Sequence, residues 1–294
     1  MNNSIISGAY DLHTHSGPDL LPRKFDDFDM AQRVIESGMA GYAAKSHYFC
    51  TTDRAKLVKK LYPACDCVGT MWLNNSVGGL NPYAVDLAGR AGTKIIGMPT
   101  VDTETSIYKT FQMAPEKRAF WATIIAEMKA EGFEPVPVKI SEDGKLVPAI
   151  YEVLDIIAKY NMILATGHCT PPETRMLVKA ARERKVERII CTHVSVASIF
   201  HDIDSQKELI KSGAYMEHCT NGITSGKVDW DMMYGQIKAI GPDHVIIATD
   251  LGQPKNRYPD EGLLDFCERL QKEGMPDTEI RKMIVDNPVR LLKS

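Results

Sequence analysis

The sequence alternates between short β-branched segments and amphipathic helical segments, and eight segments of the first kind can be identified. Most of them recur at intervals of roughly 25 to 32 residues, the size of one strand–helix unit. Strands that alternate with helices form parallel sheets, and eight such units close into a barrel. The pattern therefore predicts a single (β/α)8 TIM barrel over residues 1–294. We expect its strands over Ala9–His15, Tyr42–His47, Cys67–Leu73, Lys94–Thr100, Ile163–His168, Arg188–His193, Ala214–His218 and Val245–Asp250.

One interval between strands is longer than the others. Thr100–Asn161 spans about 60 residues, more than a strand–helix connection needs. We expect it to hold helices over Pro115–Glu131 and Pro148–Tyr160, and a hairpin that turns at Asp143-Gly144. We interpret the interval as a decoration of the fourth strand–helix unit, and not as a second domain. The last segment, Asp277–Leu292, is expected to form a helix that closes the bottom or the side of the barrel.

Composition excludes several classes of protein. Hydrophobic residues make up 44% and charged residues 25%, which is typical of a globular protein. The net charge of −3 and the absence of a basic stripe argue against nucleic-acid binding. No segment reaches the roughly 18 consecutive apolar residues of a membrane span, and Met1–Tyr10 lacks the features of a signal peptide. Seven scattered cysteines without a C-x-x-C pair indicate a reducing compartment. We expect a cytoplasmic protein with a small-molecule substrate, and we leave a homo-oligomer open.

Metal-ligand residue types stand at the ends of four of the expected strands. His13 and His15 end the first strand and share a face, because alternate residues of a strand point to the same side. His168, His193 and Asp250 end the fifth, sixth and eighth strands. The carboxyl ends of all strands of a (β/α)8 barrel meet at one face, where active sites lie. Imidazole and carboxylate groups that converge there predict a site for a divalent transition metal, with zinc favoured and manganese, iron, cobalt or nickel as alternatives.

This arrangement of ligands resembles the amidohydrolase superfamily of metal-dependent hydrolases. The resemblance covers nearly the whole chain, and the ending Asn287-Pro288-Val289-Arg290-Leu291-Leu292 is similar to the superfamily's closing helix. More narrowly, three segments resemble an uncharacterised bacterial and archaeal branch labelled cytosolic metal-dependent hydrolase: Asp19–Lys24, Lys45–His47 and Thr249–Gln253. The resemblance implies that His13, His15 and Asp250 hold one metal and that His168 and His193 hold a second.

The reaction expected from this resemblance is hydrolysis of an amide, ester, lactone or phosphoester bond in a small molecule. A metal lowers the pKa of water from ~15.7 toward ~7, and so supplies hydroxide at neutral pH. Asp250 is the expected catalytic residue, since its carboxylate can accept the proton of the attacking water and deliver it to the leaving group.

The sequence departs from the superfamily at the fourth strand. Many two-metal members carry a carboxylated lysine or a glutamate there as a bridge between the metals, whereas here Lys94 stands at the wrong end of its strand. Some members take the bridge from strand two, where Lys45 and His47 share a face. We therefore predict that Lys45 is a metal ligand through a carboxylated side chain. A lysine that faces the substrate or forms a salt bridge is the alternative.

Three further residues are candidate substrate contacts. His47 follows Lys45 at the second strand end, His218 ends the seventh strand, and Arg23 follows the first strand, where it could bind an anion. A buried polar residue is the alternative for His218, and a solvated loop charge is the alternative for Arg23.

Other functions compete with the hydrolase interpretation. The opening Asp11-Leu12-His13-Thr14-His15 also resembles a phosphoesterase of the polymerase-and-histidinol-phosphatase type. That family usually shows Thr-Asp-His at strand two and Asp-x-His near the end, whereas this chain has Lys45-Ser46-His47 and Asp250-Leu251-Gly252. A metal-dependent decarboxylase and a non-catalytic metal-binding barrel are the remaining alternatives.

The ligand pattern predicts that the protein purified from metal-replete medium carries one or two transition-metal ions per chain, measured by elemental analysis. If Lys45 bridges two ions, Lys45→Ala will lose roughly half of the bound metal, and short carboxylic acids will partly restore activity in place of the carbamate. A protein that is free of metal and binds none on titration would contradict the assignment.

Overall fold

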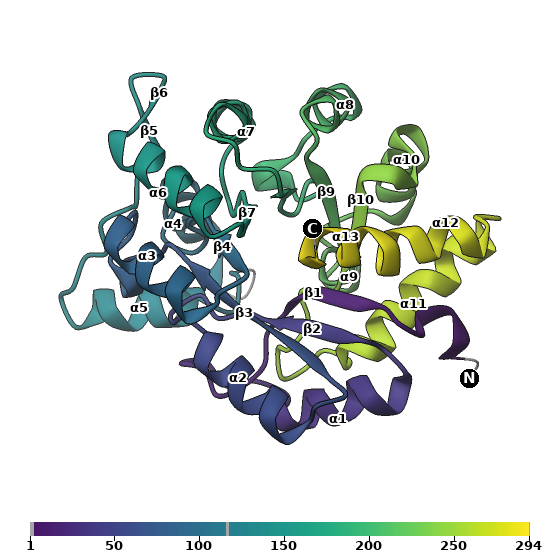
Figure 1. Ribbon diagram of the computed structural model, residues 1–294. Helices are drawn as coiled ribbons and strands as arrows, with labels where there is room; N and C mark the ends of the chain where they lie inside the picture. The colour runs from purple at the N-terminus through teal and green to yellow at the C-terminus, as the bar shows by residue number, and fades with distance from the viewer. Residues whose placement is uncertain (1–2, 116–117, 294) are drawn as a thin grey trace.

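A computed structural model describes residues 3–115 and 118–293 and confirms the predicted (β/α)8 barrel (Figure 1). Eight strands form one parallel sheet in which each strand pairs with the next along the chain. Their bounds, in the order of the sheet, are β1 (Tyr10–Thr14), β2 (Gly41–Ala44), β3 (Asp66–Trp72), β4 (Ile95–Gly97), β7 (Ile163–Ala165), β8 (Ile189–Cys191), β9 (Tyr215–Cys219) and β10 (Val245–Ala248). Seven of the strands end one to three residues earlier than predicted, because the residues that follow them turn away from the sheet, and β9 ends one residue later.

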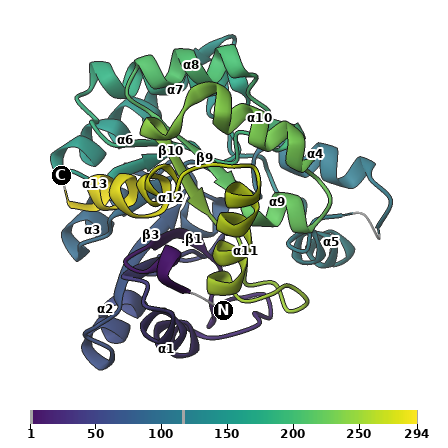
Figure 2. The same cartoon turned by 90° about the vertical axis from the view of Figure 1, so that its right-hand side faces the viewer.

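Helices surround the sheet, and α11 runs beside the start of the chain and β1 (Figure 2). Their bounds are α1 (Asp27–Ser37), α2 (Thr52–Leu61), α3 (Pro82–Ala91), α4 (Glu104–Gln112), α5 (Ala122–Ala130), α6 (Pro148–Lys159), α7 (Pro171–Glu183), α8 (Ile203–Lys211), α9 (Thr220–Thr224), α10 (Trp230–Ile240), α11 (Pro259–Lys272), α12 (Asp277–Arg281) and α13 (Asn287–Lys293). A π-helical turn over Lys282–Asp286 joins α12 to α13. Within the described residues, no helix has both the length and the apolar character of a membrane span.

The long interval after β4 holds the predicted hairpin and one helix that the sequence analysis did not predict. Strands β5 (Ser141–Glu142) and β6 (Lys145–Leu146) pair antiparallel across Asp143 and Gly144, both of which have positive φ angles. Helix α6 confirms the second predicted helix. The first, expected from residue 115, is the shorter α5, and residues 116–117 lie outside the described residues. The unpredicted helix is α4, which follows β4 after a short loop.

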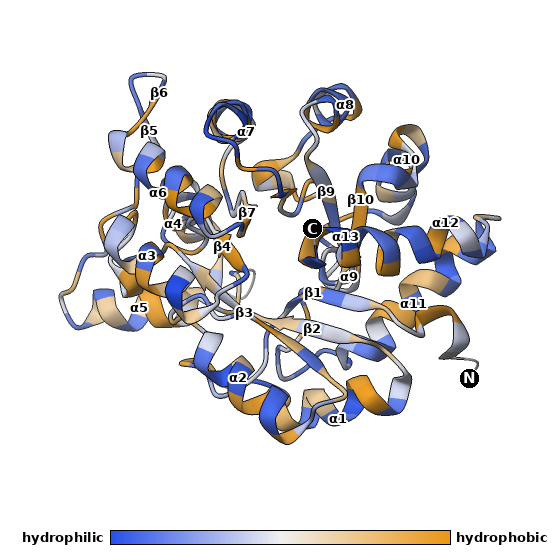
Figure 3. Cartoon of the chain, viewed as in Figure 1, coloured by the Kyte–Doolittle hydropathy of each residue, from blue (hydrophilic) through white to orange (hydrophobic). Residues whose placement is uncertain are grey.

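A buried cluster drawn from every strand of the sheet fills the inside of the barrel. It includes Leu12 on β1, Trp72 on β3, Ile190 on β8 and Ile246 on β10. The strand residues that alternate with these point toward the helices and belong to two other buried clusters, which lie between the sheet and the helices. Figure 3 shows the matching pattern, with hydrophobic colour along β10 and alternating colours along α1 and α2. Leu291 and Leu292 of α13 join the inner cluster, so the predicted final helix closes the bottom of the barrel.

The barrel closes where β1 meets the segment that follows β10. The Asp250 N–H donates to the carbonyl of His13 over 2.8 Å, and the His15 N–H donates to the carbonyl of Leu251 over 2.8 Å. We call this junction the seam. It lies at the carboxyl end of the sheet, so the residues that close the barrel are the same residues, or neighbours of those, that the sequence predicts to bind metal.

Asp11 stabilises the seam from the helix side of β1. Its fully buried carboxylate accepts the backbone N–H groups of His13 (3.1 Å) and Thr249 (3.0 Å) and the hydroxyls of Thr14 and Thr249. Burial raises the pKa of Asp11 above its ordinary value, and these hydrogen bonds oppose that shift. One side chain thus joins the first strand to the last.

We expect Asp11→Ala to lower the free energy of unfolding by about 3 kcal/mol, because it leaves several buried donors without an acceptor. Urea denaturation of the metal-free protein would measure the change. The control is Glu152→Ala on the exposed side of α6, which should stay within about 0.5 kcal/mol of the parent. Equal stabilities of the two variants would contradict the role given to Asp11.

Candidate metal centre

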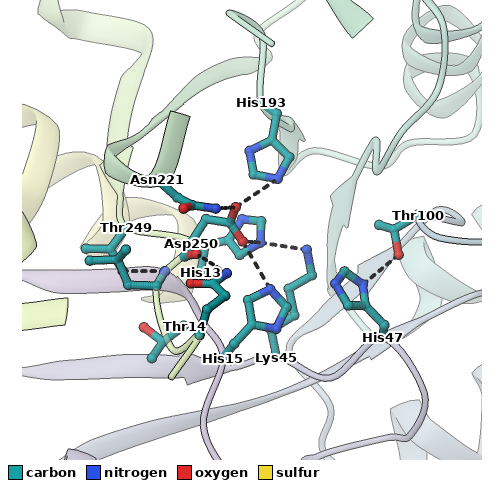
Figure 4. A network of polar contacts seen from close by, with 12 residues as sticks. His13, Thr14, His15, Lys45, His47, Thr100, His193, Asn221, Thr249 and Asp250 are labelled. Atoms are coloured by element: carbon teal, nitrogen blue, oxygen red, sulfur yellow. Dashed lines mark hydrogen bonds and ion pairs between the residues drawn. The ribbon is translucent and has the colours of Figure 1, made fainter. Parts of the chain in front are cut away.

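The site lies at the rim, which we define as the residues that end the barrel strands or directly follow them at the carboxyl end. Figure 4 shows the side chains of His13, His15, Lys45, His193 and Asp250 pointing toward one another. They come from four segments of the chain, the ends of β1, β2, β8 and β10. All but Asp250 are buried, and the Asp250 side chain is 17% exposed. The structure therefore brings together most of the residues that the sequence predicts as ligands.

A β-bulge in β1 gives His13 and His15 their positions. Asp11 and Thr14 lie three positions apart, yet they pair with β2 residues that lie two positions apart. The extra residue allows Leu12 to pack inside the barrel while the next side chain, His13, also points inward. Strict alternation would send Leu12 to the helix side, so the predicted convergence of the two histidines is present, but the bulge produces it.

Asp250 lies between the two histidines. Its Oδ1 is 3.2 Å from His13 Nε2 and 3.0 Å from His15 Nε2. Its Oδ2 accepts a hydrogen bond of 2.8 Å from the Asn221 side chain. These three side chains form one of the two groups in the described residues that could hold a metal ion.

Left-handed backbone turns aim three of the rim side chains. His193 and Asp250 both have a φ of 53°, which non-glycine residues seldom adopt, and Gly167, just before His168, has a φ of 60°. A Cβ atom at Gly167 would lie 2.4 Å from the carbonyl oxygen of Met98, so no larger residue fits there. Unusual backbone angles at non-glycine residues concentrate at functional sites, where the surrounding structure holds them in place.

Glu217 on β9 is a site residue that the sequence analysis missed. Its buried carboxylate lies 3.1 Å from His13 Nδ1 and 3.7 Å from His193 Nδ1. Although burial acts to raise its pKa, the charge and hydrogen bond of His13 hold the pKa of Glu217 at about 2. An ionised carboxylate only accepts hydrogen bonds, so His13 carries a proton on Nδ1, and Nε2 is the ring nitrogen that would face a metal.

The second group that could hold a metal consists of His13, His193, Glu217 and Cys219. The predicted ligand His168 belongs to neither group. Its ring lies 5.8 Å from the ring of His193, and its Nδ1 is 3.0 Å from the hydroxyl of Ser106 on α4.

Lys45 reaches the centre of the site. Its Nζ lies 2.6 Å from His13 Nε2 and 3.9 Å from the centre of the Trp72 ring. No carboxylate of the described residues forms a salt bridge with it, so of the two alternatives for Lys45 only the lysine that faces the substrate stays open. Burial lowers the pKa of Lys45 to about 8, against the opposing charges of Asp250 and Glu217. Its amine therefore lies beside the nitrogen that would face a metal and loses its proton more readily than an exposed lysine.

The structure places one predicted substrate contact, His47, beside the metal-ligand candidates and buries the side chain of another, Arg23. The His47 ring lies 4.8 Å from the His15 ring, and His47 Nδ1 is 2.9 Å from the Thr100 hydroxyl. The Arg23 guanidinium forms a buried ion pair with Asp19, so it is not the solvated loop charge considered as its alternative.

The prediction that His218 contacts the substrate is wrong. His218 points to the helix side of β9, where its Nδ1 lies 2.9 Å from the hydroxyl of Ser195. Side chains alternate along a strand, so the inward position belongs to its neighbour Glu217. The sequence did contain a signal. Tyr215, Glu217 and Cys219 share one face of the strand, and an acidic residue on that face indicates a functional position.

Most imidazoles of the site are neutral near pH 7, as metal ligands must be. Burial is the largest cause in each case. It lowers the pKa of His15, His47 and His168 well below the ordinary value, and it lowers that of His193 to about 4.

Solved structures of proteins named as hydrolases share this fold, as the resemblance implies. An amidohydrolase from Pseudomonas aeruginosa matches with a TM-score of 0.65 at 10% identity, over 99% of this chain and 97% of that chain. The probable dipeptidase PvdM from Pseudomonas aeruginosa gives 0.60 at 11% identity, over 99% and 95%. A variant of the organophosphorus hydrolase from Deinococcus radiodurans gives 0.54 at 13% identity, over 97% and 93%.

The chain belongs to the family of unknown function DUF6282, whose sequence model matches residues 8–217. That segment includes His13, His15, Lys45, His168, His193 and Glu217, and it ends before Cys219 and Asp250. A search of curated proteins finds no significant match.

The contact between Glu217 and His13 predicts that Glu217→Gln weakens metal binding by about tenfold or more, as is typical when a residue that orients a metal-ligating histidine is changed. Competition with a chromogenic chelator would measure the affinity. The matched control is His218→Asn, one residue along on the opposite face of β9. It should change thermal stability but leave the metal affinity within about twofold of the parent. Equal losses of metal affinity in both variants would show that the effect is not specific to the inward face.

Proposed function

We propose that the protein is a metal-dependent hydrolase that cleaves an amide, ester, lactone or phosphoester bond in a small molecule. The observation that carries the proposal is the convergence of His13, His15 and Asp250 within 3.0–3.2 Å at the carboxyl end of a (β/α)8 barrel. The barrels with the same fold that are named as hydrolases support the same class of reaction.

The donor atoms fit one divalent ion. Ligands that each lie about 2.1 Å from a tetrahedral metal lie roughly 3.4 Å from one another, close to the separations observed here. Nitrogen and carboxylate donors favour zinc, and we propose zinc as the resident metal.

The bound metal would lower the pKa of the attacking water and polarise the bond under attack. Asp250 would take the proton from that water and pass it to the leaving group. Although burial acts to raise its pKa, the charge of His13 and the hydrogen bonds of His13 and His15 hold the pKa of Asp250 well below its ordinary value. The carboxylate is therefore ionised at neutral pH. Asn221 keeps Oδ2 oriented while Oδ1 faces the histidines.

We further propose that Lys45 reacts with CO₂ to form a carbamate, with the nitrogen–carbon bond made as the amine loses a proton. The carbamate, His168 and His193 would then hold a second metal. The buried position of Lys45, its lowered pKa and the absence of a salt bridge in the described residues support a neutral amine that can react. A substrate-facing ammonium with one metal is the alternative, and the two differ in metal content.

We expect Asp250→Asn to retain the fold and most of the metal but to lower kcat by roughly 10² to 10⁴, because an amide cannot accept the proton. Turnover of ester, lactone, amide and phosphoester panels by the zinc-loaded protein would measure the change, with metal content determined on the same samples. The control Asp243→Asn removes a carboxylate from an exposed ion pair with Lys282 and should keep full activity. If no panel member is turned over by the parent protein while metal is bound, the hydrolase proposal is wrong.

A further inference from the structure

The loop after β1 places Arg23 at the rim, where hydrogen bonds from its guanidinium fix its position. Arg23 Nε and Nη2 both donate to Oδ2 of Asp19, over 2.8 and 2.6 Å. The two side chains are 4% and 0% exposed. The other Asp19 oxygen accepts the hydroxyl of Ser46, which stands between Lys45 and His47. Arg23 is thus anchored to the segment that carries two of the candidate site residues.

The same loop is also attached to the far side of the site. The Lys24 N–H donates to the carbonyl of Gly252 over 2.9 Å, and Gly252 packs so closely on His15 that a Cβ atom there would overlap the His15 carbonyl. Through Asp19 and Ser46 the ion pair is held next to Lys45 and His47, and the His47 ring lies 4.8 Å from the His15 ring. The guanidinium therefore lies next to the site and not on a remote surface.

Two hydrogen-bond donors near this ion pair have no acceptor among the described residues. Within the described residues, Arg23 Nη1 makes no hydrogen bond, so the terminal edge of the guanidinium is not occupied by protein. The hydroxyl of Tyr48 is buried and has no hydrogen-bond partner among the described residues. The Tyr48 N–H donates over 3.0 Å to the Ser46 hydroxyl, which itself donates to Asp19. A buried hydroxyl without a hydrogen-bond partner lowers the stability of the folded chain. If the ion pair served only to stabilise the loop, the Tyr48 hydroxyl beside it would not need to stay without a partner.

We propose that Arg23 and Tyr48 form a subsite that binds a carboxylate group of the substrate, beside the bond that is cleaved. This inference rests on the proposed function for the same site and narrows its substrates to small molecules that carry a carboxylate. The terminal edge of a guanidinium presents two parallel N–H groups that match the two oxygens of a carboxylate, and the tyrosine hydroxyl supplies a third donor.

The charge balance favours a carboxylate over a phosphate. Asp19 already neutralises Arg23, and the carboxylate of Asp19 would lie close to the bound anion. A dianionic phosphate would bring one more negative charge to that place than a monoanionic carboxylate does, and like charges at short range oppose binding. The built ion pair thus positions the arginine and also limits the charge that the subsite accepts.

The test measures binding by calorimetry to the zinc-loaded full chain, with acetate, malonate, succinate, glutarate and inorganic phosphate as probes. Acetate reports on the metal alone, and the diacids can reach the metal and the subsite together. We expect at least one diacid to bind about tenfold more tightly than acetate, and Arg23→Gln to abolish that gain. Tyr48→Phe removes a hydroxyl without a protein partner, so it should fold normally and weaken the diacid roughly fivefold.

The matched control is Lys24→Gln, which removes a neighbouring positive charge outside the ion pair and should leave the diacid affinity unchanged. A gain that survives in both Arg23→Gln and Tyr48→Phe would overturn the subsite, as would a gain shown by phosphate alone. The readout needs no turnover. Diacid binding that depends on Arg23 in a protein that hydrolyses nothing would keep the subsite and refute the hydrolase. Turnover of panel substrates by a protein whose diacid binding does not depend on Arg23 would do the reverse.

Discussion

The junction between the first and last barrel strands is the constraint on which the rest of the structure depends. A parallel sheet of eight strands has two free edges until β1 and the segment after β10 are joined. Asp11 joins them by accepting two hydrogen bonds from Thr249, and it accepts two more from His13 and Thr14 within its own strand. Its bond to the His13 N–H also satisfies the bulge that turns His13 inward. Closure of the barrel and placement of the metal ligands are thus consequences of the same local contacts.

Much of this architecture could be predicted from the sequence because it follows from periodicity. Every barrel strand was found, since buried parallel strands are short apolar runs at regular spacing, and polar residues such as His193 and Asp250 stand out at their ends. The hairpin at Asp143-Gly144 was found because two positive φ angles require a particular pair of residues.

The sequence could not show which side chains of a short strand point into the barrel and which point toward the helices. In β9 both Tyr215 and Met216 are apolar and buried, so hydrophobicity does not say which of Glu217 and His218 points inward. In β1 the bulge changes the facing midway, and only pairing with β2 reveals it. Helix α4 was missed because its sequence is mostly polar, and its buried residues, such as Ile107, depend on contacts with distant parts of the chain.

The seam also has a consequence for the order in which the protein is made. His15 and Asp250 are separated by 235 residues in sequence, so the site cannot exist on a nascent chain until the last strand has left the ribosome. Contacts between such distant residues form late, because the chain must first lose the entropy of the intervening loop. Binding of a metal by these three ligands therefore indicates that the barrel has closed. A truncated or stalled chain would contain His13 and His15 but would lack Asp250, the third ligand of the site.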